Sequence, residues 1–325
     1  MLFWIAIFVF AFVLISTPVA ITVARHTGPM DVPKDHRRMH TRPIPRNGGV
    51  PLFLAVALGV FLVSPDDLFL RAVICGGVGM LLFGLADDFI SLGAFSKLFF
   101  QVAVSVATVL GSGITAKKDV AIAVLWMVAL INAHNFIDGM DGLLAGCGCI
   151  ESTFLGVLLF GRGEGSVAIA CFLLAVSTLA FLVFNRHPAS VFAGDCGSQS
   201  IGFLLGALSL PLLLSPGESY AALSPLLLFA YPVTELVSSV LRRLLRGRTP
   251  FASDRAHLHH RLHAAGVGHA ACVRLLLCVC LFIGGLGVLL SVRALWIFAS
   301  LLSFLSALLL ICLRVWVTDQ KKISL

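Results

Sequence analysis

Long apolar stretches constrain the fold of this chain more than any other feature. Hydrophobic residues make up 59% of its 325 residues and charged residues only 12%, whereas a soluble domain carries about 25% charged residues. The sequence therefore predicts an all-α, polytopic integral membrane protein that forms a single domain over residues 1–325. About eleven stretches qualify as spans: residues 2–24, 49–63, 69–86, 97–114, 120–137, 142–160, 166–184, 199–214, 220–241, 271–290 and 294–316. The first is too long for a signal-peptide core and lacks a basic flank, which favours a retained span.

Basic residues fall mainly on one side of the alternating loops. Most of the 23 lysines and arginines lie in the C-terminal tail and in five loops, at residues 25–46, 87–97, 132–142, 185–198 and 242–270. Only Arg71, Lys117, Lys118, Arg162 and Arg293 fall on the other side. The positive-inside rule then predicts that the five loops are cytoplasmic, with the N-terminus outside and the C-terminus inside the cytoplasmic (inner) membrane. All ten histidines map to the same side, so we expect the chemistry at the cytoplasmic face.

The stretch from Asn132 to Leu143 gathers polar groups within a very apolar chain. Asn132, Asn135, Asp138 and Asp141 recur every three residues, a spacing that brings side chains to one face of a helix. Gly139 and Gly142 indicate that the helix breaks into a turn here, since an interior glycine costs about 1 kcal/mol relative to alanine. Oxygen donors of this kind suit a hard cation such as Mg²⁺. A polar loop between two membrane helices is the alternative.

A pair of adjacent acids, Asp87 and Asp88, closes the third apolar stretch, and Lys97 opens the next one. Two like charges at a membrane boundary cost free energy unless a cation or a functional role compensates. Lysine is a compact charge suited to a phosphate. The alternatives are solvated boundary acids and a lysine that extends its charged end to the membrane surface.

Two further loops carry residues suited to anions or metals. The first holds Arg46 before Gly48-Gly49, where glycine lets the backbone approach a ligand closely, although its basic residues are also suited to anionic lipid headgroups. Phe192 precedes Asp195, which lies between Gly194 and Gly197. Flanking glycines predict a tight turn with an exposed carboxylate, although aspartates beside glycine often only form turns.

The last basic loop contains three histidines, His257, His259 and His260, in an arginine-rich setting that includes Arg255. Zinc binding is one interpretation, but neighbouring cysteine or glutamate ligands are missing from the loop. A site for a pyrophosphate fits the donors better.

Two glutamates, Glu151 and Glu235, fall inside predicted spans. An ionisable group at that depth indicates function by default. Glu235 follows Pro232 about two turns before the last basic loop, so we expect it to face the site, whereas Glu151 is expected in a helix–helix contact.

Five motifs in order carry a family resemblance. They are Pro-Arg-Asn-Gly-Gly, Leu-Ala-Asp-Asp, Asn-Ala-His-Asn-Phe-Ile-Asp-Gly-Met-Asp-Gly-Leu, Phe-Ala-Gly-Asp-Cys-Gly-Ser and Asp-Arg-Ala-His-Leu-His-His-Arg-Leu, between about Asp31 and Leu262. Together they resemble the polyprenyl-phosphate N-acetylhexosamine-1-phosphate transferases, in the branch that initiates teichoic acid and O-antigen synthesis. The chain departs from the pattern at His134, between the two asparagines, and at Cys196, after Asp195.

The resemblance implies a reaction and a set of roles. N-acetylglucosamine-1-phosphate would pass from UDP-N-acetylglucosamine to undecaprenyl phosphate with release of UMP, in cell wall or polysaccharide biosynthesis. It implies Mg²⁺, with Mn²⁺ as a substitute, on Asn135 and Asp195. The implied catalytic residues are Asp87, Asp88, Asp138 and Lys97. The implied substrate-binding residues are Asp141 and Phe192 for uracil, His257, His259 and His260 for pyrophosphate, and Arg255 and Arg46.

Several alternatives stay open at this point. The donor could be another UDP-amino sugar, or the transferred group could be phospho-MurNAc-pentapeptide, and a homodimer is a further alternative. A polytopic transporter would also carry intramembrane acids, but it would place them near the bilayer midplane. A CDP-alcohol phosphotransferase would also use aspartates and Mg²⁺, but its Asp-Gly-x-x-Ala-Arg signature is missing from the sequence.

Overall fold

The computed structural model describes residues 1–32, 42–215, 219–249 and 257–290. Seven helices within these ranges are long and apolar enough to cross a membrane. They are α1 (Leu2–Thr27), α3 (Leu68–Ile90), α4 (Ala94–Gly111), α5 (Lys117–Ile137), α6 (Leu143–Phe160), α7 (Gly165–Asn185) and α13 (His269–Leu290). The predicted all-α polytopic membrane fold is confirmed. In the described part of the chain, the β-structure is a short antiparallel pair, β1 (Met30–Asp31) and β2 (Ile44–Pro45), with two residues in each strand.

Helix α8 (Gly194–Leu208) lies at the centre of the bundle. It contacts α3 and α5 most extensively and also α2 (Gly49–Val63), α6 and α7. Apart from Asp195, its residues are buried on every face. Because the helix is rich in glycine, serine and alanine, its neighbours approach its backbone closely, as is usual between membrane helices.

Two glycine positions show how close this approach is. A β-carbon on Gly49 of α2 would lie 2.3 Å from Gly197 Cα, and one on Gly84 of α3 would lie 2.5 Å from Cys196 Cα. Side chains at these positions would push α2 and α3 away from α8. Gly48 and Gly49 therefore serve contact with α8 and with the Phe192 backbone, rather than the ligand approach expected from the sequence.

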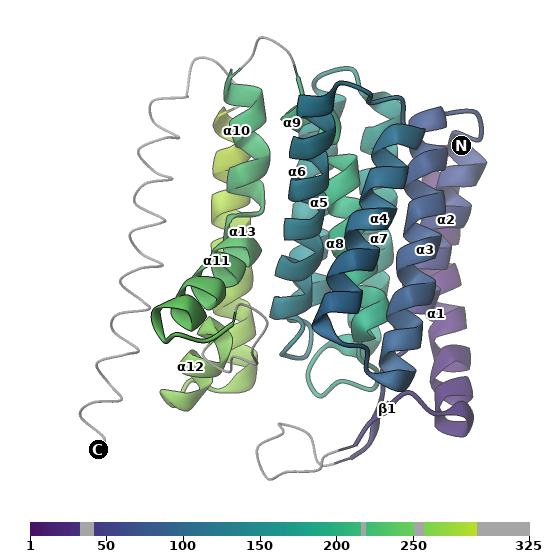
Figure 1. The fold of residues 1–325 in the computed structure, drawn as a ribbon. Helices are drawn as coiled ribbons and strands as arrows, with labels where there is room; N and C mark the ends of the chain where they lie inside the picture. The colour runs from purple at the N-terminus through teal and green to yellow at the C-terminus, as the bar shows by residue number, and fades with distance from the viewer. Residues whose placement is uncertain (33–41, 216–218, 250–256, 291–325) are drawn as a thin grey trace.

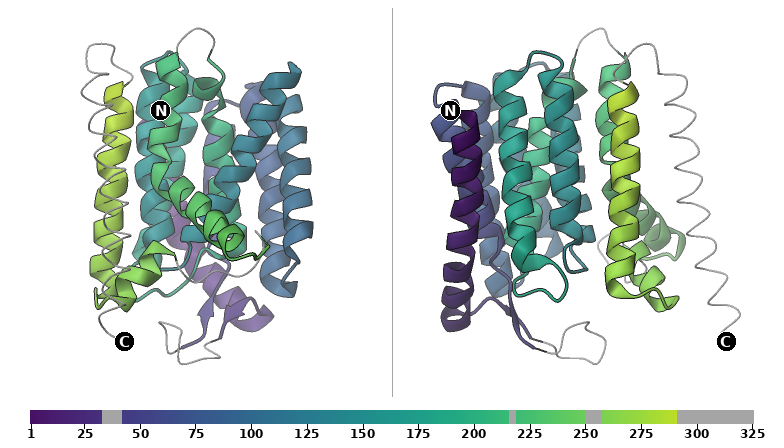
Figure 2. Two further views of the ribbon diagram at one scale, coloured as in Figure 1. Left: turned by 60° about the vertical axis from the view of Figure 1, so that its left-hand side comes forward. Right: turned by 180° about the vertical axis from the view of Figure 1, so that it is seen from behind.

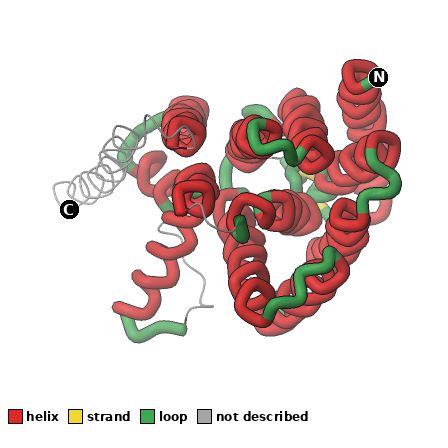
Figure 3. Tube along the Cα trace, turned by 90° about the horizontal axis from the view of Figure 1, so that it is seen from above, coloured by secondary structure: helices red, strands yellow, loops and turns green. Residues whose placement is uncertain are grey.

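The predicted count of eleven spans is not confirmed. The expected ninth span, residues 220–241, is wrong as a continuous helix, because the chain forms α10 (Ser219–Leu228) and α11 (Ala230–Leu245), with a break at Phe229. Pro225 and Pro232 each remove an amide hydrogen-bond donor on either side of this break. Figures 1 and 3 show α11 turning out of the line of α10, and α11 contacts α5 of the bundle. The expected eleventh span, residues 294–316, lies outside the described residues.

The loops that carry the motifs gather at one end of the bundle, below the helices in Figure 1. This end holds the β1–β2 pair, the turns after α3, α5 and α7, and α12 (Leu258–Ala264). The two further views show the same end, with α10 and α13 standing beside the bundle (Figure 2). Helix α9 (Leu210–Leu213) lies at the opposite end, after α8.

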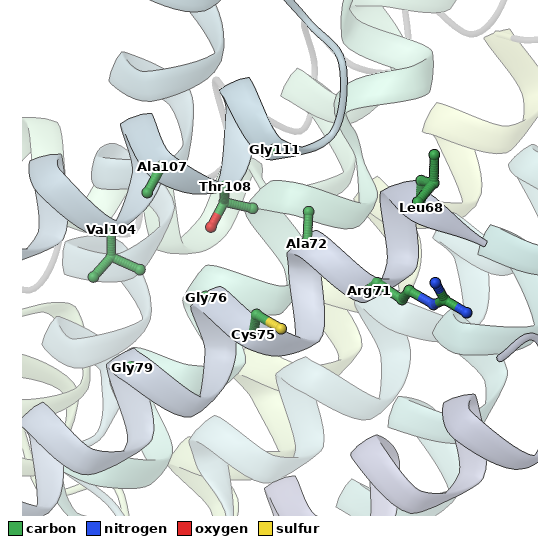
Figure 4. A pocket seen from close by; sticks show the side chains of 10 residues that line it. All are labelled: Leu68, Arg71, Ala72, Cys75, Gly76, Gly79, Val104, Ala107, Thr108 and Gly111. Carbon is green, nitrogen blue, oxygen red and sulfur yellow. The ribbon is translucent and has the colours of Figure 1, made fainter. Parts of the chain in front are cut away.

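A cleft of about 450 Å³ lies between α3 and α4, towards the end of the bundle away from the motifs. Small side chains line it, with Arg71 near the start of α3 (Figure 4). Arg71 pairs with Asp66 of the preceding loop at 2.7 Å. Carboxylates are missing from the lining of this cleft, and the acidic motif residues lie at the other end of these helices, so the candidate site belongs there.

Candidate active site

The two adjacent acids at the end of α3 have different partners. One oxygen of Asp87 accepts the Leu92 amide at 2.7 Å, and the other contacts Lys97 Nζ of α4. Both side-chain oxygens of Asp88 accept backbone amides of α8, from Asp195 at 2.9 Å and from Cys196 at 3.0 Å. A carboxylate stabilises the first turn of a helix, where amides lack partners. Asp88 therefore holds α8 in place, while Asp87 orients the lysine.

Asp195 lies in the first turn of α8 between the two cations of the site. Its carboxylate is 3.2 Å from Arg46 Nη2 and 3.8 Å from Lys97 Nζ, and its side chain keeps 15% of its surface exposed. Arg46 also pairs with Asp88 at 3.3 Å. Gly194 has a φ of 74° and its β-position meets the Arg46 carbonyl, so glycine is required to aim Asp195 in this direction. The predicted tight turn with an exposed carboxylate is wrong, because Gly194, Asp195 and Gly197 all lie in α8 and the Asp195 side chain is mostly buried.

The end of α5 brings the polar residues of the central motif to the same place. Asn135 Oδ1 accepts a hydrogen bond from Ser198 Oγ of α8 at 2.8 Å. Asn132 Nδ2 donates to Gln101 Oε1 of α4 at 2.7 Å. The two amides therefore connect α5 to the two helices that carry Asp195 and Lys97, which is how residues distant in sequence share one site.

Asp138 follows the last residue of α5. Burial is the largest cause that raises the pKa of this carboxyl group, to about 7; Arg46 opposes the shift, while the carboxylates of Asp195 and Asp88 add to it. Several carboxyl groups thus lie close together, and the nearby positive charge is too small to keep the pKa of Asp138 at its usual value. Carboxylate and amide oxygens are the donors that a hard divalent cation prefers, which makes Asp195 and the Asn135 carbonyl its candidate ligands, with Asp138 beside them.

Asp141 lies among partners that the sequence did not single out. Its Oδ2 accepts hydrogen bonds from His187 Nδ1 at 2.7 Å and from the Ala189 amide at 3.1 Å, and it lies 3.9 Å from His269 Nε2. Asn185 accepts from the Gly142 amide at 3.1 Å and donates to the Val191 carbonyl at 2.9 Å. Asn185, His187 and His269 are the residues that sequence reasoning missed; the polar Asn-Arg-His run ending α7 is the signal that could have found the first two.

The Asp141, His187 and His269 side chains place three potential metal-ligand atoms within 4.8 Å of one another. The two imidazole rings, however, are stacked, with centroids 4.2 Å apart and planes 23° apart. A metal lies in the plane of each imidazole that binds it, so two stacked, nearly parallel rings do not bind one ion in this arrangement. The cluster instead connects three segments: hydrogen bonds join the α5–α6 turn to the α7–α8 loop, and stacking of His269 on His187 adds the start of α13.

Phe192 is half-buried, and both its backbone amide and its backbone carbonyl form hydrogen bonds. Its amide donates to the Pro45 carbonyl at 2.8 Å, and its carbonyl accepts from Gly48 at 3.0 Å. These bonds fix the α7–α8 loop against the segment that carries Arg46.

Of the three motif histidines, the structure describes the side chain of His257. It is buried, and its ring contacts Phe136 of α5 edge to face at 5.3 Å between centroids. His259 and His260 lie on α12, but their side chains are outside the described part of the structure, as is Arg255 as a whole.

Both glutamates that the sequence placed inside predicted spans lie beside histidines. Glu151 of α6 lies 2.7 Å from Nε2 of His134 on α5, whose Nδ1 lies 2.8 Å from the Leu130 carbonyl, and both side chains are buried. Glu151 therefore lies in a helix–helix contact, as expected, and the unusual His134 is its partner. Glu235 lies beside His257, with Nδ1 and Oε2 3.3 Å apart.

Comparisons with known proteins agree with this geometry. The family model described as glycosyl transferase family 4 matches residues 70–212, which hold all the acids of the site. The chain is 31% identical over 273 residues to a probable undecaprenyl-phosphate N-acetylglucosaminyl 1-phosphate transferase of Bacillus subtilis, covering 79% of this chain and 76% of that one. It is 34% identical over 308 residues to a decaprenyl-phosphate N-acetylglucosaminephosphotransferase of Mycobacterium tuberculosis H37Rv, with 81% and 75% covered.

A third relative is the undecaprenyl-phosphate alpha-N-acetylglucosaminyl 1-phosphate transferase of Yersinia pestis, 30% identical over 290 residues, with 82% of this chain and 76% of the relative covered. Each match extends over most of both proteins, so the similarity is not confined to the motifs. The resemblance carried by the five motifs is thereby confirmed. This chain belongs to glycosyl transferase family 4.

Proposed function

We propose that this membrane protein transfers N-acetylglucosamine-1-phosphate from UDP-N-acetylglucosamine to undecaprenyl phosphate and releases UMP. The product would be the first lipid-linked intermediate of a cell-envelope glycopolymer. The names of the relatives support the acceptor and the sugar. The observation that carries the proposal is the position of Asp195, between Arg46 and Lys97 at the end of the bundle where the other motif acids lie.

The reaction joins two anions. A phosphate oxygen of the lipid attacks the sugar-bearing phosphorus of the nucleotide sugar, the bond between that phosphorus and the bridging oxygen breaks, and UMP leaves with that oxygen. Positioning and charge neutralisation dominate such phosphoryl transfers. Lys97 and Arg46 would contribute positive charge on the protein side, and Asp87 would keep Lys97 directed at the reacting groups.

Mg²⁺, or Mn²⁺ in its place, would supply the charge that neutralises the pyrophosphate. We propose Asp195 and Asn135 as its ligands, with Asp138 beside them, because this set offers the oxygen donors that such ions require. Ser198, which now donates to Asn135, would keep the amide oxygen directed towards the carboxylates.

Asp138 is the best candidate for the group that accepts a proton from the lipid phosphate. Its pKa of about 7 is close to the second pKa of a phosphate monoester, about 6, so proton transfer between them is nearly balanced. Both oxygens of Asp88 already accept backbone amides, which favours a role in holding α8. Asp141 and Phe192 would hold the uracil, and His257, His259, His260 and Arg255 the pyrophosphate.

We also propose that the site end faces the cytoplasm in the inner membrane, with the N-terminus outside and the C-terminus inside. The distribution of lysine and arginine supports this orientation. A soluble nucleotide sugar would then reach a lipid whose tail stays in the bilayer.

Radiolabel transfer tests the proposal. Purified protein in lipid vesicles that contain undecaprenyl phosphate is supplied with a panel of labelled UDP-amino sugars and with UDP-MurNAc-pentapeptide, each with Mg²⁺. We expect a butanol-soluble labelled lipid and an equal amount of UMP, with UDP-N-acetylglucosamine as the preferred donor. Transfer from another donor alone would correct the sugar, and the absence of UMP with every donor would contradict the reaction.

A further inference from the structure

Glu235 is a buried carboxylate on α11, which lies beside α5. It lies on α11, after Pro232, and its side chain is completely buried. A carboxylate removed from water raises the free energy of the fold unless charged or hydrogen-bonding groups compensate. Its partners therefore indicate why it is present.

The described partners of Glu235 lie at the start of the histidine motif. The Leu258 amide donates to the carboxylate, at 3.2 Å from Oε1 and 3.3 Å from Oε2, and His257 Nδ1 lies 3.3 Å from Oε2. An ionised carboxylate only accepts hydrogen bonds, so Nδ1 carries the proton in this contact. One side chain thus fixes both the backbone at the start of α12 and the orientation of the first histidine.

His257 in turn contacts the helix that carries the acidic motif. Its ring packs edge to face on Phe136, the residue after Asn135 on α5, and the Arg243 guanidinium lies 5.2 Å from the centre of the same Phe136 ring. Glu235, His257 and Phe136 therefore form a continuous chain of contacts from α11 to the end of α5. Figure 1 shows α11 and α12 next to each other beside the bundle, at the end where α5 finishes.

We propose that Glu235 is the positioning residue of the histidine motif: it holds His257 through Nδ1 so that the ring meets the pyrophosphate of the nucleotide sugar through Nε2. The inference rests on the proposed function and adds a residue that acts through His257 without touching substrate. Helix α11 itself contacts α5, and Glu235 links α11 directly to His257 at the start of α12. A histidine whose one nitrogen is fixed by a carboxylate presents the other in a defined direction.

A double-mutant cycle tests this dependence. Glu235→Gln, His257→Ala and the double variant are purified, and kcat and KM are measured separately for the nucleotide sugar and for undecaprenyl phosphate. We expect each single change to raise the KM for the nucleotide sugar by about tenfold, with a smaller effect on the lipid KM. The loss in the double variant should be clearly smaller than the product of the two single losses, because the contact of Glu235 with the ring is already gone in His257→Ala, and only its contact with the Leu258 amide remains.

Glu151→Gln is the matched control. Glu151 is equally buried in a helix and also binds a histidine, His134 at 2.7 Å, but the described structure places no contact between it and the histidine motif. In a variant that carries both Glu151→Gln and His257→Ala, the fold-loss of activity should equal the product of the two single fold-losses. A cycle that is non-additive for Glu235 and additive for Glu151 supports the proposal.

The outcomes separate this inference from the proposed function. If the unmodified protein makes no lipid-linked sugar, the proposed function fails. If it does make lipid-linked sugar, two results would refute the positioning role and leave the reaction standing. One is that the fold-changes of Glu235→Gln and His257→Ala multiply in the double variant; the other is that Glu235→Gln leaves the KM for the nucleotide sugar unchanged. Should Glu235→Gln lose its thermal unfolding transition, the same cycle is measured with Glu235→Asp, which keeps the charge on a shorter stem; additivity there would equally refute the role.

Discussion

At the scale of single residues, neighbours in sequence have separate tasks. Asp87 and Asp88 are adjacent, yet one contacts Lys97 of α4 and the other holds the first amides of α8. The site is thus built by dividing carboxylates between structural and chemical roles. Asp195 and Asp138 remain as the acids best placed to act on substrates and metal, and each gives a prediction.

Asp195→Asn should lower turnover by about a hundredfold or more, because the loss of a charged metal ligand removes several kcal/mol of stabilisation from the transition state. Steady-state kinetics with a Mg²⁺ titration measure this, and the thermal unfolding temperature in detergent shows that the fold is kept. Activity close to that of the unmodified protein at millimolar Mg²⁺ would remove Asp195 from the metal site.

Asp138 should give activity and stability opposite dependences on pH. Its pKa is raised from 3.8 to about 7 in the folded protein, so the deprotonated form that accepts a proton appears as pH rises through 7, and kcat should rise with it. Folding favours the protonated form, so the contribution of this group to stability is fully present below about pH 4 and is lost as pH rises through 7.

Asp138→Asn separates the two effects. This variant should lose most activity while unfolding at a higher temperature than the unmodified protein at pH 8, and the difference in unfolding temperature should shrink towards pH 4. An unchanged pH profile of kcat in Asp138→Asn would assign proton transfer to another group.

At the scale of helices, the position of α8 decides the geometry of the site. It carries Asp195, Cys196 and Ser198, which contact residues from the loop before α2, from α3 and from α5. Glycines on α2 and α3 allow those helices to reach its backbone. The acids therefore come together only if these helices remain in close contact.

Gly49→Ala tests that contact. Its β-carbon would lie 2.3 Å from Gly197, so α2 or α8 must shift, at a cost of about 1–3 kcal/mol. We expect a lower unfolding temperature together with lower kcat. Gly93→Ala is the control, because Gly93 has open space around its β-position and a φ of −67°; equal losses in both variants would show that close packing on α8 is not the cause.

The sequence predicted most of the helices and several site residues, but it did not predict the break at Phe229 or the contacts between distant helices. Apolar length identified most helices, and motif spacing identified Asp195, Lys97 and the end of α5, because both properties are local. The break at Phe229 was missed, since the apolar pattern continues through it and the flanking prolines are tolerated within membrane helices. The partners of Asp88, Asp141 and Glu235 could not be predicted, because they depend on which distant helices meet.

At the scale of the whole molecule, one end of a membrane bundle holds all the motif residues that the structure describes. Successive spans cross the membrane in opposite directions, so their loops alternate between the two ends of the bundle. Once the direction of one span is known, the side of every other loop follows. All loops of the site therefore lie on the same side of the membrane, and one measurement of that side tests the predicted orientation of the whole site.

Thiol labelling measures this orientation. Ser190→Cys at the site end and Lys118→Cys at the other end are both exposed positions, and each is introduced into a background without the native cysteines. A membrane-impermeant maleimide should label Lys118→Cys in intact cells and Ser190→Cys only after lysis. The reverse pattern would turn the protein over in the membrane and place the nucleotide site outside.

The late position of the α10–α13 segment in the chain also affects how the protein is made. Arg46, Lys97, Asp138 and Asp195 all precede α9 in sequence, whereas Glu235, His257 and His269 come from the last part of the described chain. Because a nascent chain emerges from its N-terminus and folds in that order, the acidic half of the site is complete while the ribosome is still at work. His257 and His269 then arrive last, so under the proposed function a partly synthesised protein in the membrane would have the carboxylates of the site but would not yet hold a nucleotide sugar.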